Sequence, residues 1–594
     1  MTGIQGARDK RRRGIMLITL AGIIFFMLYV STRAQSAPRG FVPSGYRTCE
    51  RDADIECGRI SVPRDYFNVS KGRTEIAVAR YRTRDEPRHG TLFINAGGPG
   101  GSGVNLMFVL GKLLARLFPG YDIVGFDPRG VGLTLPAVAC FPTFRDEEVF
   151  KHNTVLSQGF NVPPGDPSVP ENSAAILSQM RQWLALHKAQ SDMCLNATDA
   201  EDLPNMSTAT VARDVAYMTT VLDGDDSLIH FWGPSYGTII GSYLVNMFPD
   251  RIGRVSLDGV VNPWEWSNVP AHRRLGSMFD NTEEAFDYIL DRCGAAGPRR
   301  CALARHTGEK GKHIAHRLDS FLDQLYDHPL VYTNSSRRGI ITSGMVRALL
   351  YFSTNAPMHF ATIATAVASA MDGKLSELAA LTLKPFRDLA TPLPGDTARN
   401  IISCLDAPPY DADRPETWPT AEELTINGIN RLRTVSPRFG LSVSLFEDDG
   451  ACQFFAKAAV KLPERFTGPF NQSLRNPILI VSADLDPITP LVNARWVNEQ
   501  LGQSARLVIQ QDTPAHSTFF LGPSLCVAKI YRRFYATGEL PEAKETLCSN
   551  ELKLFSDDES TILKVDEDED PKFVDLVREL QQVMGHYFPL GLPG

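Results

Sequence analysis

A serine flanked by glycines is the first candidate for chemistry in this chain of 594 residues. Residues 233–237 read Gly-Pro-Ser-Tyr-Gly, after an apolar run of strand length at 228–232 and before a helical pattern from about Thr238 to Met247. Glycines on both sides of the serine permit the tight strand-to-helix turn that exposes a hydroxyl at the edge of a sheet. The pattern predicts Ser235 as the nucleophile of an acyl-transfer reaction, against the alternative of an ordinary turn that contains a serine.

A glycine-rich loop at 95–103 (NAGGPGGSG) follows another apolar run, 91–95. Five glycines in seven positions leave backbone N–H groups unobstructed, and the oxyanion of acyl transfer needs two such donors. We predict the backbones of Gly98 (or an adjacent residue) and Tyr236 as these donors. A phosphate-binding loop is excluded because no lysine followed by serine or threonine ends the segment. A dinucleotide-binding fingerprint is excluded because Pro99 interrupts it.

The general base and the acid that orients it are expected further along the chain, in the order serine, acid, histidine. Residues 482–490 follow an apolar run and contain two carboxylates, Asp484 and Asp486, between which spacing does not decide. His516 comes soon after the next such run, 506–509. We predict His516 as general base, although a lone histidine is more often a surface or core residue. This chemistry needs no metal and no organic cofactor.

Apolar runs of strand length alternate with helical patterns along the chain, which is typical of a mostly parallel sheet covered by helices. Strands are predicted at 74–81, 91–95, 121–126, 228–232, 252–257, 477–482 and 506–509, and a helix at 207–222. The core is expected in two parts, 46–262 and 471–550, separated by a mainly helical cap at 263–470. The acidic tail, 551–594, contains a helical pattern at 573–583 that we expect to be a solvated surface helix.

The N-terminal segment predicts a membrane anchor. Basic residues between Arg8 and Arg13 precede an uncharged, mostly apolar run from Gly14 to Val30, which reaches the lower limit for a membrane-spanning helix. The basic flank predicts a cytoplasmic tail at 1–13, so that a linker at 31–45 and the body of the protein are lumenal or extracellular. The alternative is a signal peptide, removed by cleavage near the small residues Thr32 and Ala34.

Ten cysteines and five acceptor tripeptides for N-glycosylation also indicate an oxidising compartment. The acceptors are Asn68, Asn196, Asn205, Asn334 and Asn471. From chain order we prefer disulfides between neighbouring cysteines: Cys49 with Cys57, Cys140 with Cys194, Cys293 with Cys301, Cys404 with Cys452, and Cys526 with Cys548. No CxxC pair supports a zinc site, and a net charge of −7 gives no support to nucleic-acid binding.

Several short segments carry a family resemblance. They are 62–66 (VPRDY), 97–103 (GGPGGSG), 127–132 (DPRGVG), 212–214 (ARD), 233–237 with Phe248-Pro249, 257–261 (LDGVV) and 485–490 (LDPITP). Through them the chain resembles the proline-iminopeptidase and tripeptidyl-aminopeptidase group of serine peptidases, most closely its tripeptidyl-aminopeptidase-like branch, from about Cys49 to Cys548.

This resemblance implies an α/β-hydrolase fold and a triad of Ser235, His516 and Asp486, the acid being the residue four before the final proline of its motif. It also fits the pairing of neighbouring cysteines. The implied activity is removal of short peptides or single residues from a free N-terminus through an acyl-enzyme. One departure is that His516 lies between Ala515 and Ser517, where relatives usually carry glycines.

An exopeptidase must also hold the ammonium group of its substrate, so the cap should present carboxylates. Candidates are Glu265, Asp280, Glu283 and Glu284, although acids also favour the first turn of any helix. Trp264 and Trp266 could line the pocket, but packing beneath the cap is the expected role.

Two other functions fit the same residues. An esterase or amidase acting on a small molecule would use the same fold and nucleophile. A membrane-anchored adhesion module without catalysis is disfavoured because the serine, acid, histidine and glycine loop are all present.

Overall fold

The computed structural model describes residues 47–49, 51–138, 140–197, 202–334, 338–383, 396–445, 451–459, 461–519, 521–551, 554–555 and 570–586. The predicted anchor at 14–30 lies outside these residues and stays a prediction. Within the described ranges, no helix has both the length and the apolar content that a membrane crossing requires.

A ten-stranded sheet forms the centre of the molecule, in the order β1-β2-β3-β5-β4-β6-β7-β10-β11-β12. Its strands are β1 (Arg47–Cys49), β2 (Asp52–Pro63), β3 (Arg73–Tyr81), β4 (Gly90–Ile94), β5 (Tyr121–Phe126), β6 (Ile229–Pro234), β7 (Ile252–Asp258), β10 (Ile478–Ala483), β11 (Ala505–Gln510) and β12 (Glu545–Cys548). The pairs from β1 to β5 are antiparallel and those from β5 to β12 are parallel. The mostly parallel sheet and all seven predicted strands are therefore confirmed.

Helices cover both faces of the sheet because its strands are apolar on both sides. One face packs against α2 (Gly103–Leu117), α19 (Leu525–Thr537) and α20 (Pro571–His586); the other packs against α6 (Thr208–Asp223), α7 (Gly237–Met247) and α18 (Leu491–Leu501). Serine side chains accept from backbone N–H groups at the start of α2, α6 and α19. Such caps explain why these helices begin where they do.

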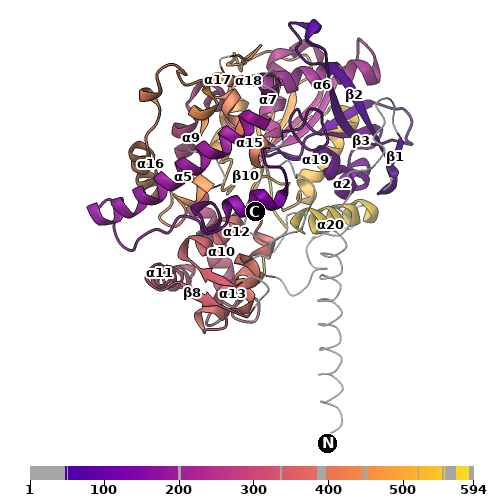
Figure 1. The fold of residues 1–594 in the computed structure, drawn as a ribbon. Coiled ribbons are helices and arrows are strands. Elements are labelled where there is room, and N and C mark those ends of the chain that lie inside the picture. The colour runs from indigo at the N-terminus through magenta and orange to yellow at the C-terminus, as the bar shows by residue number, and fades with distance from the viewer. Residues whose placement is uncertain are drawn as a thin grey trace, which may run out of the picture.

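The terminal helix α20 corrects one prediction. Its apolar side, which includes Phe573, Val577 and Leu580, is buried against α2 and α19. The helix is amphipathic and docked on the core (Figure 1), so the expectation of a solvated surface helix is wrong.

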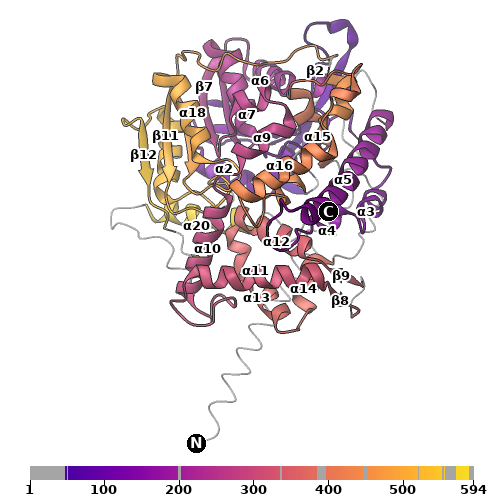
Figure 2. The ribbon, with the colours of Figure 1, turned by 90° about the vertical axis from the view of Figure 1, so that its left-hand side faces the viewer.

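The cap is built from helices that follow β7 and precede β10. They are α8 (Pro263–Asn268), α9 (Ala271–Met278), α10 (Thr282–Ala296), α11 (Gly311–Asp327), α12 (Ser343–Asn355), α13 (Phe360–Met371), α14 (Ser376–Thr382), α15 (Asp396–Asp406), α16 (Ala421–Thr434) and α17 (Ala456–Ala459), with a hairpin of β8 (Leu330–Tyr332) and β9 (Gly339–Ile341). Helices α10 to α14 form a lobe below the sheet in both views (Figures 1 and 2).

A second insertion joins this cap. Residues 144–197 form α3 (Phe144–Lys151), α4 (Val155–Gln158) and α5 (Pro170–Ala197), and α5 lies along α16. Arg181 of α5 bonds Glu422 of α16 at 2.7 Å, and Trp183 and Leu424 share a buried cluster. The predicted first part of the core, 46–262, therefore contains a segment that belongs to the cap.

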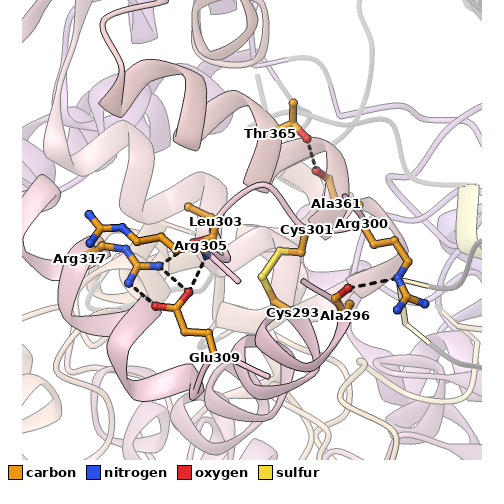
Figure 3. The surroundings of a disulfide bond; sticks show 10 residues. All are labelled: Cys293, Ala296, Arg300, Cys301, Leu303, Arg305, Glu309, Arg317, Ala361 and Thr365. Atoms are coloured by element: carbon orange, nitrogen blue, oxygen red, sulfur yellow. Dashed lines mark hydrogen bonds and ion pairs between the residues drawn. A yellow bond between two sulfur atoms is a disulfide. The ribbon is translucent and has the colours of Figure 1, made fainter. Parts of the chain in front are cut away.

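Five disulfides join the ten cysteines, and each cysteine pairs with its neighbour in the chain, as preferred from their order. The Cys293–Cys301 bridge secures the connection from α10 to α11 (Figure 3). Beside it, Glu309 accepts from the Arg305 backbone N–H at 2.7 Å and from Arg317 at 2.5 Å. The disulfide and this ion pair together fix the connection between the first two helices of the lobe.

The predicted glycosylation acceptors differ in exposure. Asn68, Asn196, Asn334 and Asn471 are exposed, and whether they carry glycans stays a prediction. Asn205 is only 3% exposed in a short 3-10 helix, Leu203–Met206. This burial argues against Asn205 as an acceptor, since a glycan needs a side chain on the surface of the folded protein, and its modification stays untested.

Three of the segments that carried the family resemblance, 62–66, 127–132 and 212–214, meet in one buried ionic network. Arg129 donates through Nε and Nη2 to Asp214, at 2.7 and 2.8 Å, and through Nη1 and Nη2 to the carbonyls of Arg64 and Pro63, at 2.6 Å each. Tyr66 adds a bond from its hydroxyl to Asp214, at 2.8 Å. The network joins the end of β2, the loop after β5 and helix α6.

Arg129→Ala is predicted to lower the free energy of unfolding by about 3–5 kcal/mol, because Asp214 would keep a buried charge without its partner. The Arg129 and Asp214 side chains are 3% and 1% exposed. The measurement is urea unfolding followed by far-UV circular dichroism. Arg84→Ala is the control, since this side chain is 87% exposed and its loss should change the same quantity by less than about 0.5 kcal/mol. Equal effects of the two substitutions would contradict the role given to the network.

Candidate active site

Ser235 lies on the turn between β6 and α7, with φ at +56°. This left-handed conformation is rare for a residue with a side chain and points the hydroxyl away from the sheet. A Cβ at Gly233 would approach the Gly237 carbonyl oxygen to 2.6 Å, so glycine is required there. The Ser235 N–H donates to the carbonyl of Asp258, at the end of the neighbouring β7, at 2.9 Å. The sharp turn, called here the elbow (residues 233–237), is thus anchored to the next strand.

Asp486 lies in the loop after β10, and His516 lies in the loop after β11. His516 contacts Ser235, and Asp486 contacts His516. Nε2 of His516 is 2.8 Å from the Ser235 Oγ, and Nδ1 is 3.1 and 3.3 Å from the two carboxylate oxygens of Asp486. Because an ionised carboxylate can only accept, Nδ1 carries the hydrogen and the Nε2 lone pair faces the serine hydroxyl. Asp486 is fully buried and His516 is 5% exposed. The structure therefore brings together the three residues predicted as a triad.

The structure also separates the two candidate acids. Asp484 accepts the backbone N–H groups of Asp512 and Thr513, at 2.8 and 2.9 Å, and so shapes the loop after β11. Asp486 is the carboxylate that reaches His516, in agreement with the family motif. Four further bonds fix its orientation: from the backbone N–H groups of Ile488, Thr489 and Ser517, and from the Thr489 hydroxyl.

Thr489 is a site residue that the sequence analysis did not single out. Its Oγ1 lies 2.7 Å from Asp486 and 3.2 Å from Nδ1 of His516. Its place within the LDPITP segment is the signal that could have identified it.

The loop that carries His516 is held from both the core and the cap. Ser517 has φ at +55°, a left-handed conformation that glycine adopts more readily than serine. Its N–H donates to Asp486 at 2.6 Å. The His516 N–H donates to the carbonyl of Asn355, at the end of cap helix α12, at 3.2 Å. The position of the imidazole thus depends on the cap as well as on the sheet.

The glycine-rich loop lies against the elbow. A Cβ on Gly97 would meet the Ser235 Cβ at 3.3 Å, so the loop approaches the serine as closely as glycine allows. Behind it, Asp127 accepts from the Ser102 hydroxyl at 2.7 Å and the Val104 N–H at 3.0 Å, which fixes the start of α2. Tyr236 precedes α7, so its N–H has no acceptor within that helix. These features are compatible with the predicted donors, Gly98 and Tyr236, whose role stays a prediction.

Comparisons with known proteins agree with this arrangement. A family model described as alpha/beta hydrolase fold matches residues 90–282, which include Ser235, and a model described as TAP-like protein matches residues 445–548, which include Asp486 and His516. These matches support the α/β-hydrolase fold and its tripeptidyl-aminopeptidase-like branch for this chain.

Individual relatives support this membership. Serine protease Hip1 from Mycobacterium tuberculosis is 27% identical over 82% of this chain and 86% of that protein. Tripeptidyl aminopeptidase from Streptomyces coelicolor is 34% identical over 35% of this chain and 36% of that protein. Carboxylesterase B from Mycobacterium tuberculosis is 26% identical over 82% and 85% of the two chains. Together with the arrangement of Ser235, His516 and Asp486, these similarities support a serine hydrolase.

The cap carboxylates of this α/β-hydrolase have different surroundings. The Glu283 carboxylate forms an ion pair with Arg438 and accepts a hydrogen bond from the Ser436 hydroxyl. Glu284 is exposed. Glu265 lies in the first turn of α8. Asp280 lies two residues before Thr282, whose hydroxyl donates to the Pro487 carbonyl at 2.6 Å, in the loop that carries Asp486. Partial burial raises the pKa of Asp280.

The two tryptophans are also distinguished. Trp266 is 3% exposed, and its ring packs on the Tyr236 ring with centroids 5.9 Å apart. The Arg274 guanidinium lies over the Trp266 ring, 4.2 Å from the ring centroid. The expected packing role is confirmed for Trp266. Trp264 is 49% exposed and does not share it.

Asp258 is a second buried carboxylate that sequence analysis did not assign. It accepts from the Thr518 N–H at 2.9 Å, from the Thr518 hydroxyl and from the Tyr531 hydroxyl at 3.1 Å. Burial raises its pKa to about 6; the bonds from Thr518 and Tyr531 oppose that shift, and the nearby Asp486 charge adds to it. Asp258 thus joins the elbow, through its carbonyl, to the histidine loop, through its carboxyl group.

The raised pKa of Asp258 predicts a specific pH dependence of stability. The folded protein binds this proton below about pH 6, whereas the unfolded chain releases it near 3.8. The stabilisation is therefore complete below the unfolded pKa and is lost as the pH rises through 6. Relative to Asp258→Asn, the wild type should lose up to about 3 kcal/mol of unfolding free energy between pH 4 and pH 7. Urea unfolding of both proteins across this range measures the difference, and a difference that does not change with pH would refute the assignment.

Proposed function

We propose that this α/β-hydrolase cleaves short peptides or single residues from a free N-terminus through an acyl-enzyme formed on Ser235. The observation that carries the proposal is the hydrogen-bonded series from Asp486 through His516 to the Ser235 Oγ, the last contact being 2.8 Å. A complete, aligned series of this kind is not expected of an adhesion module without catalysis. The name of the Streptomyces relative, a tripeptidyl aminopeptidase, supports the exopeptidase specificity.

In the proposed reaction, Nε2 of His516 takes the hydroxyl proton as Ser235 Oγ attacks the substrate carbonyl. Asp486 stabilises the resulting imidazolium and keeps its orientation. The backbone N–H groups of Gly98 and Tyr236 would bind the oxyanion of the tetrahedral intermediate. His516 then gives the proton to the leaving amine, and a water molecule activated by the same imidazole releases the acyl group.

An esterase or amidase remains the second candidate, because Carboxylesterase B is similar over nearly the same length as the serine protease. Both reactions use the same nucleophile and differ in what the cap admits and holds.

The proposal predicts that a peptide amide with a free N-terminus is hydrolysed, that its N-acetylated form is not, and that Ser235→Ala lowers kcat by about a million-fold. Product release from the two peptides is followed by chromatography and mass spectrometry, with a simple p-nitrophenyl ester as a third substrate. Turnover of the ester alone, dependent on Ser235, would refute the exopeptidase assignment and favour the esterase. Cleavage within the N-acetylated peptide would identify an endopeptidase instead.

Recognition of the free N-terminus requires an anion in the cap, and we infer Asp280 as that group because it lies two residues before Thr282, whose hydroxyl bonds the loop that carries Asp486. Asp280→Asn should raise KM for the free peptide about 10- to 100-fold, since a hydrogen bond between two charges would be lost. The ester kcat/KM should not change. Glu284→Gln removes an exposed carboxylate from the next helix and is the matched control. Equal KM values for the two variants would exclude Asp280 as the ammonium ligand.

A further inference from the structure

A buried carboxylate of the cap is connected to the elbow through Thr208. Asp406 is the last residue of α15 and is 3% exposed. It accepts three hydrogen bonds: from the Thr208 N–H at 2.8 Å, from the Thr208 hydroxyl at 2.5 Å and from the indole N–H of Trp266 at 2.8 Å. Burial raises the pKa of Asp406, and the bonds from Thr208 and Trp266 oppose that shift because they stabilise the ionised form. Asp406 therefore ties the cap to the first turn of α6 and to α8.

The chain of bonds continues to the residue after the nucleophile. The Thr208 Oγ1 is 2.6 Å from the Tyr236 hydroxyl. Because the carboxylate can only accept, the single hydrogen of the Thr208 hydroxyl points to Asp406. The Tyr236 hydroxyl must then be the donor to Thr208. The order of donation, Tyr236 to Thr208 to Asp406, is fixed by this chemistry.

Tyr236 is held along its whole length. Its side chain is 1% exposed, its ring packs on Trp266 and its hydroxyl takes part in the chain just described. Its backbone N–H follows the left-handed Ser235, and such a conformation persists only where the surroundings constrain it. Fixing the far end of the Tyr236 side chain restricts rotation of the peptide group that carries this N–H.

We propose that Asp406 and Thr208 are positioning residues for the oxyanion hole, acting through the side chain of Tyr236. The inference rests on the proposed function, since it assigns a catalytic task to the Tyr236 N–H. Asp406 is itself fixed by the cap, because the neighbouring Cys404 is bonded to Cys452. The cap thus contributes to transition-state stabilisation at a group that does not contact the substrate.

The test uses Tyr236→Phe, which keeps the ring and the backbone N–H and removes only the hydroxyl. Its kcat on a p-nitrophenyl ester should fall about 10-fold with KM unchanged, a smaller loss than the 100- to 1,000-fold expected when an oxyanion donor itself is removed. Tyr243→Phe is the matched control, since Tyr243 is an equally buried tyrosine of α7 that takes no part in this chain of bonds. It should keep the wild-type kcat.

Thr208 offers a conservative pair of variants. Thr208→Val keeps the shape and removes the hydroxyl, and should lower kcat as Tyr236→Phe does; Thr208→Ser keeps the hydroxyl and should restore it. In the double variant Tyr236→Phe/Thr208→Val the losses should not add, because both changes break the same chain. Thermal unfolding of each variant separates loss of kcat from loss of folded protein.

Two results would overturn the positioning role of Thr208 and Asp406. Equal kcat for Tyr236→Phe and the wild type overturns the positioning role, as does a Thr208→Ser variant as slow as Thr208→Val. Labelling of Ser235 by a fluorophosphonate is the independent check on the proposed function. A wild-type chain that is not labelled and does not turn over the ester would overturn the proposed function, whereas normal labelling with no effect of Tyr236→Phe would overturn the positioning role alone.

Discussion

The left-handed backbone of Ser235 is the constraint on which the rest of the site depends. A residue with a side chain adopts φ of +56° at a cost, so the neighbouring structure must hold it there. Gly233 lets strand and helix approach, and the bond from the Ser235 N–H to the Asp258 carbonyl connects the turn to the next strand. The carboxyl group of Asp258 in turn holds the histidine loop. Asp258 therefore connects the turn of the nucleophile to the loop of the base, beside the contacts of that loop with Asp486 and Asn355.

Several residues in the segments that carry the family resemblance support the active site without contacting Ser235 or His516. Asp127 fixes the start of α2 behind the glycine-rich loop, and Arg129 and Asp214 join three separate segments beneath it. The Asp127 carboxyl is buried and burial raises its pKa, while its bonds from Ser102, Val104 and Leu133 oppose that shift. Such groups are specific to one geometry, since a buried polar group is tolerated only when each partner is in place. These segments therefore include residues that stabilise the surroundings of the active site as well as residues of the site itself.

Local patterns were sufficient to predict the strands, the elbow, the serine and the histidine, because each is encoded within a few residues of the chain. The choice of Asp486 over Asp484 needed the family resemblance. The features that were missed depend on contacts between distant segments. The burial of Asn205 and the docking of α20 follow from packing, not from the tripeptide or the helical pattern. Helix α5 was assigned to the core because nothing in its own sequence shows that its partner is α16. The relation of Asp406 to Tyr236 spans the cap and the core and has no sequence signature at all.

The order of the disulfides has a consequence for how such a chain is made. Each cysteine is bonded to the next one along the sequence, and no bridge encloses or crosses another. In an oxidising compartment that a chain enters from its N-terminus, every pair can close before the first cysteine of the following pair arrives. The correct partner is then also the first one available, so vectorial synthesis alone selects the native connectivity among the many that ten cysteines permit. Refolding of the complete, reduced chain has no such guidance and must rely on thiol–disulfide exchange to reach the same bridges.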